Sequence, residues 1–227
     1  MTPALESGFA VPLWVDLVAV GVGSLGGALF AGQFRDRRLD LLGVAIIGIA
    51  TGFGGGLLRD LFLDRVPRAL ESNLYLPIAT AAALLGMLLS HLFARISRLL
   101  TVLDALTLGV FAAIGTTAAL AAGLPEVPAV FLGALTAVGG SILRDLLLVV
   151  PIALMHVGSL YAVAAIAGSA LIVTLTRVGV DTTVAALVGA AVAVVIRILA
   201  LVFGWSLPEQ RTWTGWRRRP PGNPSAA

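Results

Sequence analysis

The sequence of 227 residues contains no cysteine and no lysine, and it has only two histidines. The lack of cysteine excludes disulfides, thiolate metal sites and cysteine nucleophiles, and two isolated histidines argue against a histidine-built metal centre. Without lysine a phosphate-binding Walker loop cannot work, and neither a Gly-x-Ser-x-Gly motif nor a His-Glu-x-x-His motif occurs. We therefore expect no enzyme and no cofactor.

Charge is also scarce, since charged residues make up 12% of the chain and hydrophobic residues 59%, with a mean hydropathy of +1.01. Such a composition indicates a membrane protein. Seven apolar runs are long enough to span a bilayer as helices, and they are continuously apolar rather than alternating, which argues against a barrel. The runs cover Val11–Ala31, Leu41–Leu63, Leu74–Phe93, Val102–Ala122, Val127–Val150, Met155–Leu175 and Val184–Phe203.

The second and fifth runs share a motif. Residues 52–60 read GFGGGLLRD, and residues 137–145 read AVGGSILRD. The match extends upstream, where Asp104 follows Asp16 by 88 residues, and downstream, where Tyr161 follows Tyr75 by 86 residues. The chain therefore contains an internal repeat.

Each repeat holds three runs, so the second repeat enters the membrane upside down relative to the first. The sequence predicts an all-α integral membrane protein with seven transmembrane helices, arranged as two inverted three-helix repeats plus a seventh helix. The predicted boundaries are an N-terminal segment at 1–10, repeat 1 at 11–96, repeat 2 at 97–178, the seventh helix at 179–205 and a basic tail at 206–227.

The positions of the fifteen arginines predict the orientation. With the N-terminus outside, nine arginines of the short loops and the tail fall on the inner side and three on the outer side. We therefore expect a multi-pass protein of the cell inner (plasma) membrane with its C-terminus in the cytoplasm. The basic tail suits contact with anionic lipid better than with nucleic acid.

Two three-helix repeats plus a seventh helix, with a glycine cluster and Arg-Asp on the second helix of each repeat, resemble the prokaryotic branch of the TRIC family of trimeric intracellular cation channels. The resemblance covers about residues 16–203. It implies a homotrimer in which each subunit has its own pore for potassium and other monovalent cations, near glycine-kinked second and fifth helices. Related bacterial sequences are labelled glycine transporters, so a small-molecule carrier is the alternative, and a structural trimer without transport is a third. One departure from the repeat is Ser141, which stands where repeat 1 has Gly56.

The glycine clusters suit two roles. Adjacent glycines weaken a helix and let its backbone leave helical geometry, so that freed carbonyls could line a cation pore. Small residues also allow close helix packing. The pore or kink candidates are Gly54, Gly55, Gly56, Gly139, Gly140 and Ser141, and the Ser141 hydroxyl can bond back to a backbone carbonyl.

The two Arg-Asp pairs, Arg59-Asp60 and Arg144-Asp145, should face the interior because charges are costly in the membrane. Sequence neighbours point about 100° apart on a helix, so we expect each arginine to pair with something other than its adjacent aspartate. The arginines could brace the helices or gate the path. The three-glycine run makes repeat 1 the looser repeat, which favours Arg59 for gating.

Asp16, Asp104 and Asp181 stand at the heads of the first, fourth and seventh runs. They suit helix N-caps, and alternatively Asp16 and Asp104 could be pore-mouth acids that concentrate cations.

Three further polar residues receive ordinary interpretations. Tyr75 and Tyr161 suit interfacial rings, and Arg197 suits a side chain that snorkels to the interface.

Overall fold

The computed structural model describes residues 11–34, 39–92, 97–155 and 160–207, and within these ranges the chain is all helical, as predicted. The predicted N-terminal segment and nearly all of the basic tail lie outside the described residues. The α-helices are α1 (Leu13–Ala31), α2 (Leu41–Phe62), α3 (Arg68–Glu71), α4 (Tyr75–Leu92), α5 (Ser97–Ala121), α6 (Glu126–Leu147), α7 (Tyr161–Arg177) and α8 (Thr182–Phe203). A 3-10 turn, η2 (Ala153–Met155), lies between α6 and α7.

Five of these helices, α1, α2, α5, α6 and α8, are long and apolar enough to cross a membrane. The helices α4 and α7 are apolar over shorter stretches, Tyr75–Ser90 and Tyr161–Arg177. The sixth run therefore begins later than predicted: residues 153–155 form the 3-10 turn and the helix starts only at Tyr161, so the expected start at Met155 is wrong.

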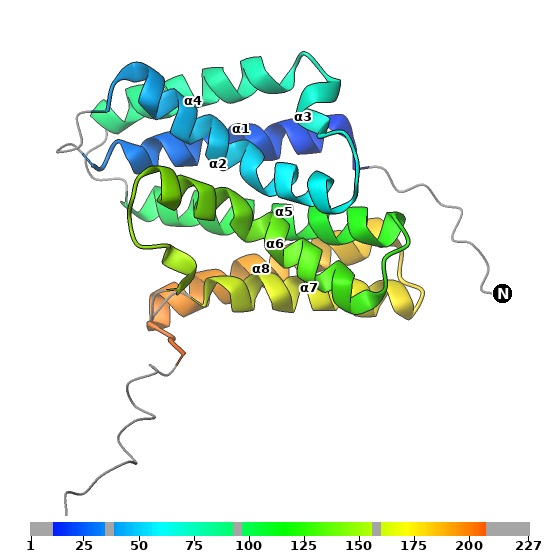
Figure 1. The fold of residues 1–227 in the computed structure, drawn as a ribbon. Coiled ribbons are helices and arrows are strands. Elements are labelled where there is room, and N and C mark those ends of the chain that lie inside the picture. Colours follow the sequence, from blue (N-terminus) through cyan, green and yellow to red (C-terminus); the bar gives the residue numbers. More distant parts are fainter. Residues whose placement is uncertain (1–10, 35–38, 93–96, 156–159, 208–227) are drawn as a thin grey trace, which may run out of the picture.

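The long helices run in alternating directions across the molecule (Figure 1). Helix α1 begins at the right-hand end of the view, whereas α5, which opens the second repeat, begins at the left-hand end. The set α1, α2 and α4 is thus repeated in the opposite direction by α5, α6 and α7, as an inverted repeat requires. The short elements α3 and η2 follow α2 and α6 at corresponding places.

Helix α5 forms the centre of the bundle. It packs against α1, α6, α7 and α8, and it is the most buried of the five long apolar helices. The two repeats meet mainly where α2 packs against α6, and α8 packs against α5 and α7. Large apolar side chains remain exposed on the outer helix faces, among them Leu42, Leu88 and Val195, as expected for a surface that contacts lipid.

The helix starts follow local chemistry. Asp181 is the N-cap of α8, where its carboxylate accepts hydrogen bonds from the backbone N–H groups of Thr183 and Val184. These bonds, the one from Val184 first, lower the pKa of Asp181. The predicted capping role is confirmed for this residue.

The glycine clusters do not interrupt the helices. Helices α2 and α6 continue through Gly54, Gly55, Gly139 and Gly140 without a break, so the expectation that the backbone leaves helical geometry there is wrong. The physical reason is that each cluster lies where the two helices approach most closely, and packing there holds the glycines in the helical conformation.

Candidate functional site

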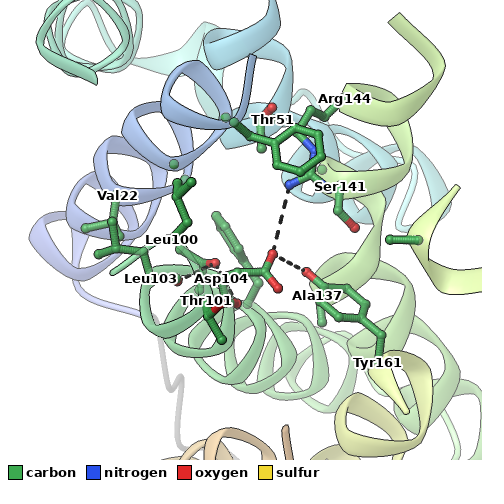
Figure 2. Close-up of a pocket in the computed structure, with 18 of the residues that line it drawn as sticks. Val22, Thr51, Leu100, Thr101, Leu103, Asp104, Ala137, Ser141, Arg144 and Tyr161 are labelled. Atoms are coloured by element: carbon green, nitrogen blue, oxygen red, sulfur yellow. Dashed lines mark hydrogen bonds and ion pairs between the residues drawn. The ribbon is translucent and has the colours of Figure 1, made fainter. Parts of the chain in front are cut away.

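Within the part of the chain that the structure describes, a larger and a smaller cavity lie toward opposite ends of the bundle. The larger has a volume of about 310 Å³ and lies among α1, α2, α5, α6, α7 and α8, at the end where α1 stops and α5 starts. We call it the Asp104 vestibule. Its lining includes Gly23, Gly27, Thr51, Asp104, Thr107, Phe111, Gly140, Ser141, Arg144, Tyr161 and Arg197 (Figure 2).

The smaller cavity, the Asp16 vestibule, has a volume of about 20 Å³, enough for about one water molecule. It lies at the opposite end of the bundle, where α1 begins and α2 ends. Its lining includes Asp16, Val20, Gly52, Gly56, Arg59, Asp60, Arg68, Tyr75 and Phe111. Several of these residues are the repeat counterparts of residues in the Asp104 vestibule, so the two cavities are related by the inverted repeat but differ in size.

Asp104 is the most connected side chain of the larger vestibule. Its Oδ1 accepts a hydrogen bond of 3.0 Å from the Tyr161 hydroxyl and lies 4.0 Å from an Arg144 nitrogen, contacts that Figure 2 shows. Its Oδ2 lies 3.5 Å from Arg197. The N-cap interpretation is wrong for Asp104, because α5 already begins at Ser97 and the carboxylate is held by side chains of other helices.

Asp16 has the corresponding arrangement in repeat 1. Its Oδ2 accepts a hydrogen bond of 2.7 Å from the Tyr75 hydroxyl and lies 3.8 Å from Arg68. Asp16 lies within the first turn of α1, whose N-cap is Pro12, so the N-cap interpretation is wrong here too. Both tyrosines are buried, at 3% and 4% exposed, and the expectation of interfacial rings is therefore also wrong.

Arg197 of α8 does not reach the interface, contrary to expectation. It is 7% exposed, and its guanidinium carbon lies 4.7 Å from the centre of the Tyr161 ring, within cation–π range. The physical reason is the nearby Asp104 carboxylate, which offers the buried charge a partner. Arg177, by contrast, is exposed and pairs with Glu126.

Each motif arginine pairs with its adjacent aspartate, which corrects the expectation from helix geometry. Arg59 donates to both carboxylate oxygens of Asp60, at 2.7 and 3.0 Å, and Arg144 donates to Oδ1 of Asp145 at 2.9 Å. The Cβ atoms of the arginine and the aspartate do point in different directions. The arginine side chain is long enough to fold back along the helix surface and bring its guanidinium group to the carboxylate.

The same aspartates fasten the segments that follow the helices. Asp60 accepts a hydrogen bond from the backbone N–H of Arg68 at the start of α3, and Asp145 accepts one from the N–H of Ala153 at the start of η2. Both pairs are buried, so their charges are compensated within the bundle. These contacts favour the bracing interpretation of the motif.

The arginines nevertheless differ in what else they touch. Arg144 lies against the Phe30 ring, with 3.9 Å between the guanidinium carbon and the ring centre, and it approaches Asp104 in the larger vestibule. Arg59, at 2% exposed, lines only the small vestibule.

The glycines form the crossing of α2 and α6. A Cβ on Gly55 would overlap the carbonyl oxygen of Thr136, and a Cβ on Gly140 would overlap that of Thr51. A Cβ on Gly54 would lie 3.0 Å from the Cα of Gly140. The two halves of this contact are related by the repeat, because Thr136 follows Thr51 by the same 85 residues that separate Arg144 from Arg59. Close packing is therefore a role of these glycines.

The candidates of the glycine clusters divide by location. Gly140 and Ser141 line the Asp104 vestibule and Gly56 lines the Asp16 vestibule. Gly54, Gly55 and Gly139 line neither. The Ser141 hydroxyl donates to the carbonyl of Val138 at 2.8 Å, as the sequence predicted.

Sequence reasoning missed three features of the site. Thr51 and Thr136 could have been found, because each directly precedes a glycine motif and extends the match between the repeats by one residue. The repeat also aligned the aspartates and the tyrosines, but their hydrogen bonds to each other were not predicted. The role of Arg197 had no sequence signal, because α8 has no repeat partner.

Comparisons with known proteins agree with the repeat structure. The family model described as glycine transporter matches residues 13–91 and 101–177, which correspond to the two three-helix units. The UPF0126 inner membrane protein YadS of Escherichia coli is 34% identical over 199 residues, which cover 86% of this chain and 94% of YadS.

Solved structures of TRIC channels share the fold. The TRIC trimeric intracellular cation channel orthologue from Rhodobacter sphaeroides matches with a TM-score of 0.78 and 33% identity, covering 85% of this chain and 97% of the other. A second structure, from work on conductance through TRIC cation channels, matches with a TM-score of 0.74 and 30% identity, covering 88% and 98%. With its apolar helices and membrane-protein relatives, the chain is a multi-pass membrane protein.

Proposed function

Since this chain belongs to the family of UPF0126 membrane proteins, whose model is described as glycine transporter and which has the TRIC fold, we propose that it is a cation channel. The channel passes potassium and other monovalent cations, and it works as a homotrimer with a pore in each subunit. The N-terminus faces outward and the C-terminus faces the cytoplasm of the inner membrane. The proposal assigns transport and no catalytic chemistry.

The observation that carries the proposal is the Asp104 vestibule, a cavity lined by helices of one chain that holds the Asp104 carboxylate. Its carboxylate is 26% exposed, whereas that of Asp145 is 2% exposed and bound to Arg144. A partly exposed carboxylate in a low-dielectric cavity attracts cations. Because the cavity lies between the repeats of one subunit, the pathway needs no second subunit to form its wall.

The described arrangement is a resting one in this proposal. Arg144 and Arg197 both lie within 4.0 Å of Asp104, so an arriving cation competes with two guanidinium groups. The Asp16 vestibule, with room for about one water, narrows the other half of the path. Conduction therefore requires both vestibules to widen and Asp104 to exchange arginine for a permeating ion.

The carrier alternative has one specific observation in its favour besides the family description. Asp104 and Arg197 place opposite charges 3.5 Å apart at the wall of the large vestibule. An amino acid such as glycine could pair its ammonium group with the carboxylate and its carboxylate with the guanidinium. A carrier would use the inverted repeats for alternating access.

Two assays on the same purified protein separate these functions. The channel proposal predicts discrete current steps in a planar bilayer with potassium salt on both sides, and no saturable glycine accumulation in proteoliposomes. Saturable glycine uptake without resolvable current would establish the carrier instead. If the assembled protein shows neither current steps nor saturable glycine uptake, the result would favour the structural trimer.

A further inference from the structure

Phe111 is the one described residue that lines both vestibules. It lies on the same face of α5 as Asp104 and Thr107, about two turns beyond Asp104 and one turn beyond Thr107. Its side chain is buried, at 5% exposed. The ring therefore occupies the point where the two cavities come closest to each other.

The space around the ring is made by glycines of repeat 1. A Cβ on Gly23 of α1 would lie 3.5 Å from the Cε2 atom of Phe111 and 3.1 Å from the Cα of Gly52 in α2. Gly23 lines the large vestibule and Gly52 the small one. The two helix backbones thus approach each other beside the ring, and no side chain of α1 or α2 separates them there.

The inverted repeat makes this arrangement asymmetric. Phe111 follows Gly23 by the same 88 residues that separate Asp104 from Asp16, so the two occupy equivalent positions. An exact pseudo-twofold axis between the repeats would place two identical side chains at these equivalent positions. The chain has a phenylalanine at one of them and a glycine at the other. The ring fills the space that the glycine leaves.

An apolar ring between two cavities of an ion pathway is a barrier to ions. A cation that passes must give up water, and an apolar wall returns no ligands, so a narrow apolar segment excludes water and ions together. Polar groups lie on both sides of Phe111, Thr107 toward one vestibule and Asp16 toward the other. The apolar section is therefore short, and displacement of one ring is enough to join the vestibules.

We propose that the Phe111 ring is the central hydrophobic barrier of the pathway and limits the rate at which a monovalent cation crosses the subunit. This inference rests on the proposed channel function. It concerns a position that neither the glycine motif nor the Arg-Asp motif includes.

The test is thallium influx into proteoliposomes, which is independent of the orientation of the protein. Phe111→Ala should raise the influx at least about tenfold over the unmodified protein, the change produced by lowering a barrier by about 1.4 kcal/mol. Phe111→Leu should raise it less. Leu108→Ala is the matched control, because Leu108 is fully buried in the same apolar cluster but lines neither vestibule.

The outcomes separate the barrier from the channel function. If the unmodified protein conducts and the Phe111 variants conduct equally, the barrier is overturned and the channel stands. Equal increases for Leu108→Ala and Phe111→Ala would also overturn it, since general loosening would explain both. If Phe111→Ala does not assemble, Phe111→Leu decides by the same criteria. Absence of thallium influx in all assembled variants would overturn the channel function itself.

Discussion

At the scale of single residues, the structure separates two kinds of buried charge. Asp60 and Asp145 each bind the adjacent arginine and a backbone N–H eight residues later, so they hold local structure together. Asp16 and Asp104 bind a tyrosine nearly sixty residues away and face the vestibules. The first kind fastens the segments that follow α2 and α6, and in the proposed channel the second kind would attract a permeating ion.

The bracing role predicts a loss of stability when Arg59 is neutralised. Arg59→Gln leaves the buried Asp60 carboxylate without its two charged hydrogen bonds, which should cost about 3 to 5 kcal/mol of unfolding free energy. Thermal unfolding in detergent measures this loss. Arg65→Gln is the control, because Arg65 is exposed on the following segment. Equal melting temperatures for the two variants would show that Arg59 does not brace the helix.

The vestibule role predicts a gain of conduction when Arg197 is neutralised. Arg197→Gln removes a positive charge 3.5 Å from Asp104, so the negative potential of the vestibule grows and cation conductance rises, by about tenfold at low salt. The increase should shrink as salt screens the charge. The exposed Arg177→Gln is the control for loss of one arginine. Lower or unchanged single-channel conductance in Arg197→Gln would contradict the role given to Asp104.

Several residue roles could not be predicted from the sequence, because they depend on how distant helices pack. The Asp16–Tyr75 bond joins two helices, and a helix-start aspartate has the same sequence signature whether an amide of the first turn or a distant hydroxyl satisfies it. The burial of Arg197 likewise depends on where α8 packs, which no periodicity within α8 reveals. Ser141, whose partner is only three residues away, was predicted correctly because its bond is local.

At the scale of helices, the crossing of α2 and α6 depends on glycine. Gly55→Ala should destabilise the protein by about 1 to 3 kcal/mol, because the new Cβ overlaps the Thr136 carbonyl and forces the two helices apart. Gly56→Ala is the matched control in the same helix, since only the end of the Arg59 side chain lies near its Cβ, at 3.9 Å. We expect it to be neutral or slightly stabilising, as alanine favours helix. Thermal unfolding of the pair checks the prediction, and equal stabilities would refute close packing at this crossing.

Helix positions were largely predictable because hydrophobic runs in a membrane protein map directly onto helices. The predicted runs end within a few residues of α1, α2, α6 and α8. The start of α7 was not predicted, because residues 153–155 form a 3-10 turn and the helix begins only at Tyr161. The sequence of one helix also could not predict whether its glycine cluster bends the backbone or packs closely, since this depends on the helix that it contacts.

At the scale of the whole molecule, the inverted repeat explains why two related vestibules point to opposite ends. The repeat was readable from the sequence alone, but the unequal sizes of the cavities were not. They depend on side chains that break the symmetry of the repeat. Phe111 in repeat 2 corresponds to Gly23 in repeat 1, and Ala153 in repeat 2 corresponds to Arg68 in repeat 1. The Asp104 vestibule instead receives an arginine, Arg197, from α8.

The arginine distribution predicts which end faces outward. Asn73 is exposed just before α4, and Ser206 is exposed just after α8. The start of α4 and the end of α8 lie at opposite ends of the bundle (Figure 1). In a chain without cysteine, Asn73→Cys should react with an impermeant thiol reagent on intact cells, and Ser206→Cys only after permeabilisation. The unmodified protein controls for background labelling. The reverse pattern would mean that the orientation is inverted.

The central claim is that each subunit contains its own cation pore. The most direct test is a bilayer recording of the unmodified protein under a gradient of potassium chloride. We predict a reversal potential close to the potassium equilibrium potential and current levels that come in equally spaced steps, up to three for one trimer. A reversal potential at the chloride equilibrium value, or a single indivisible current level from every assembly, would contradict the claim.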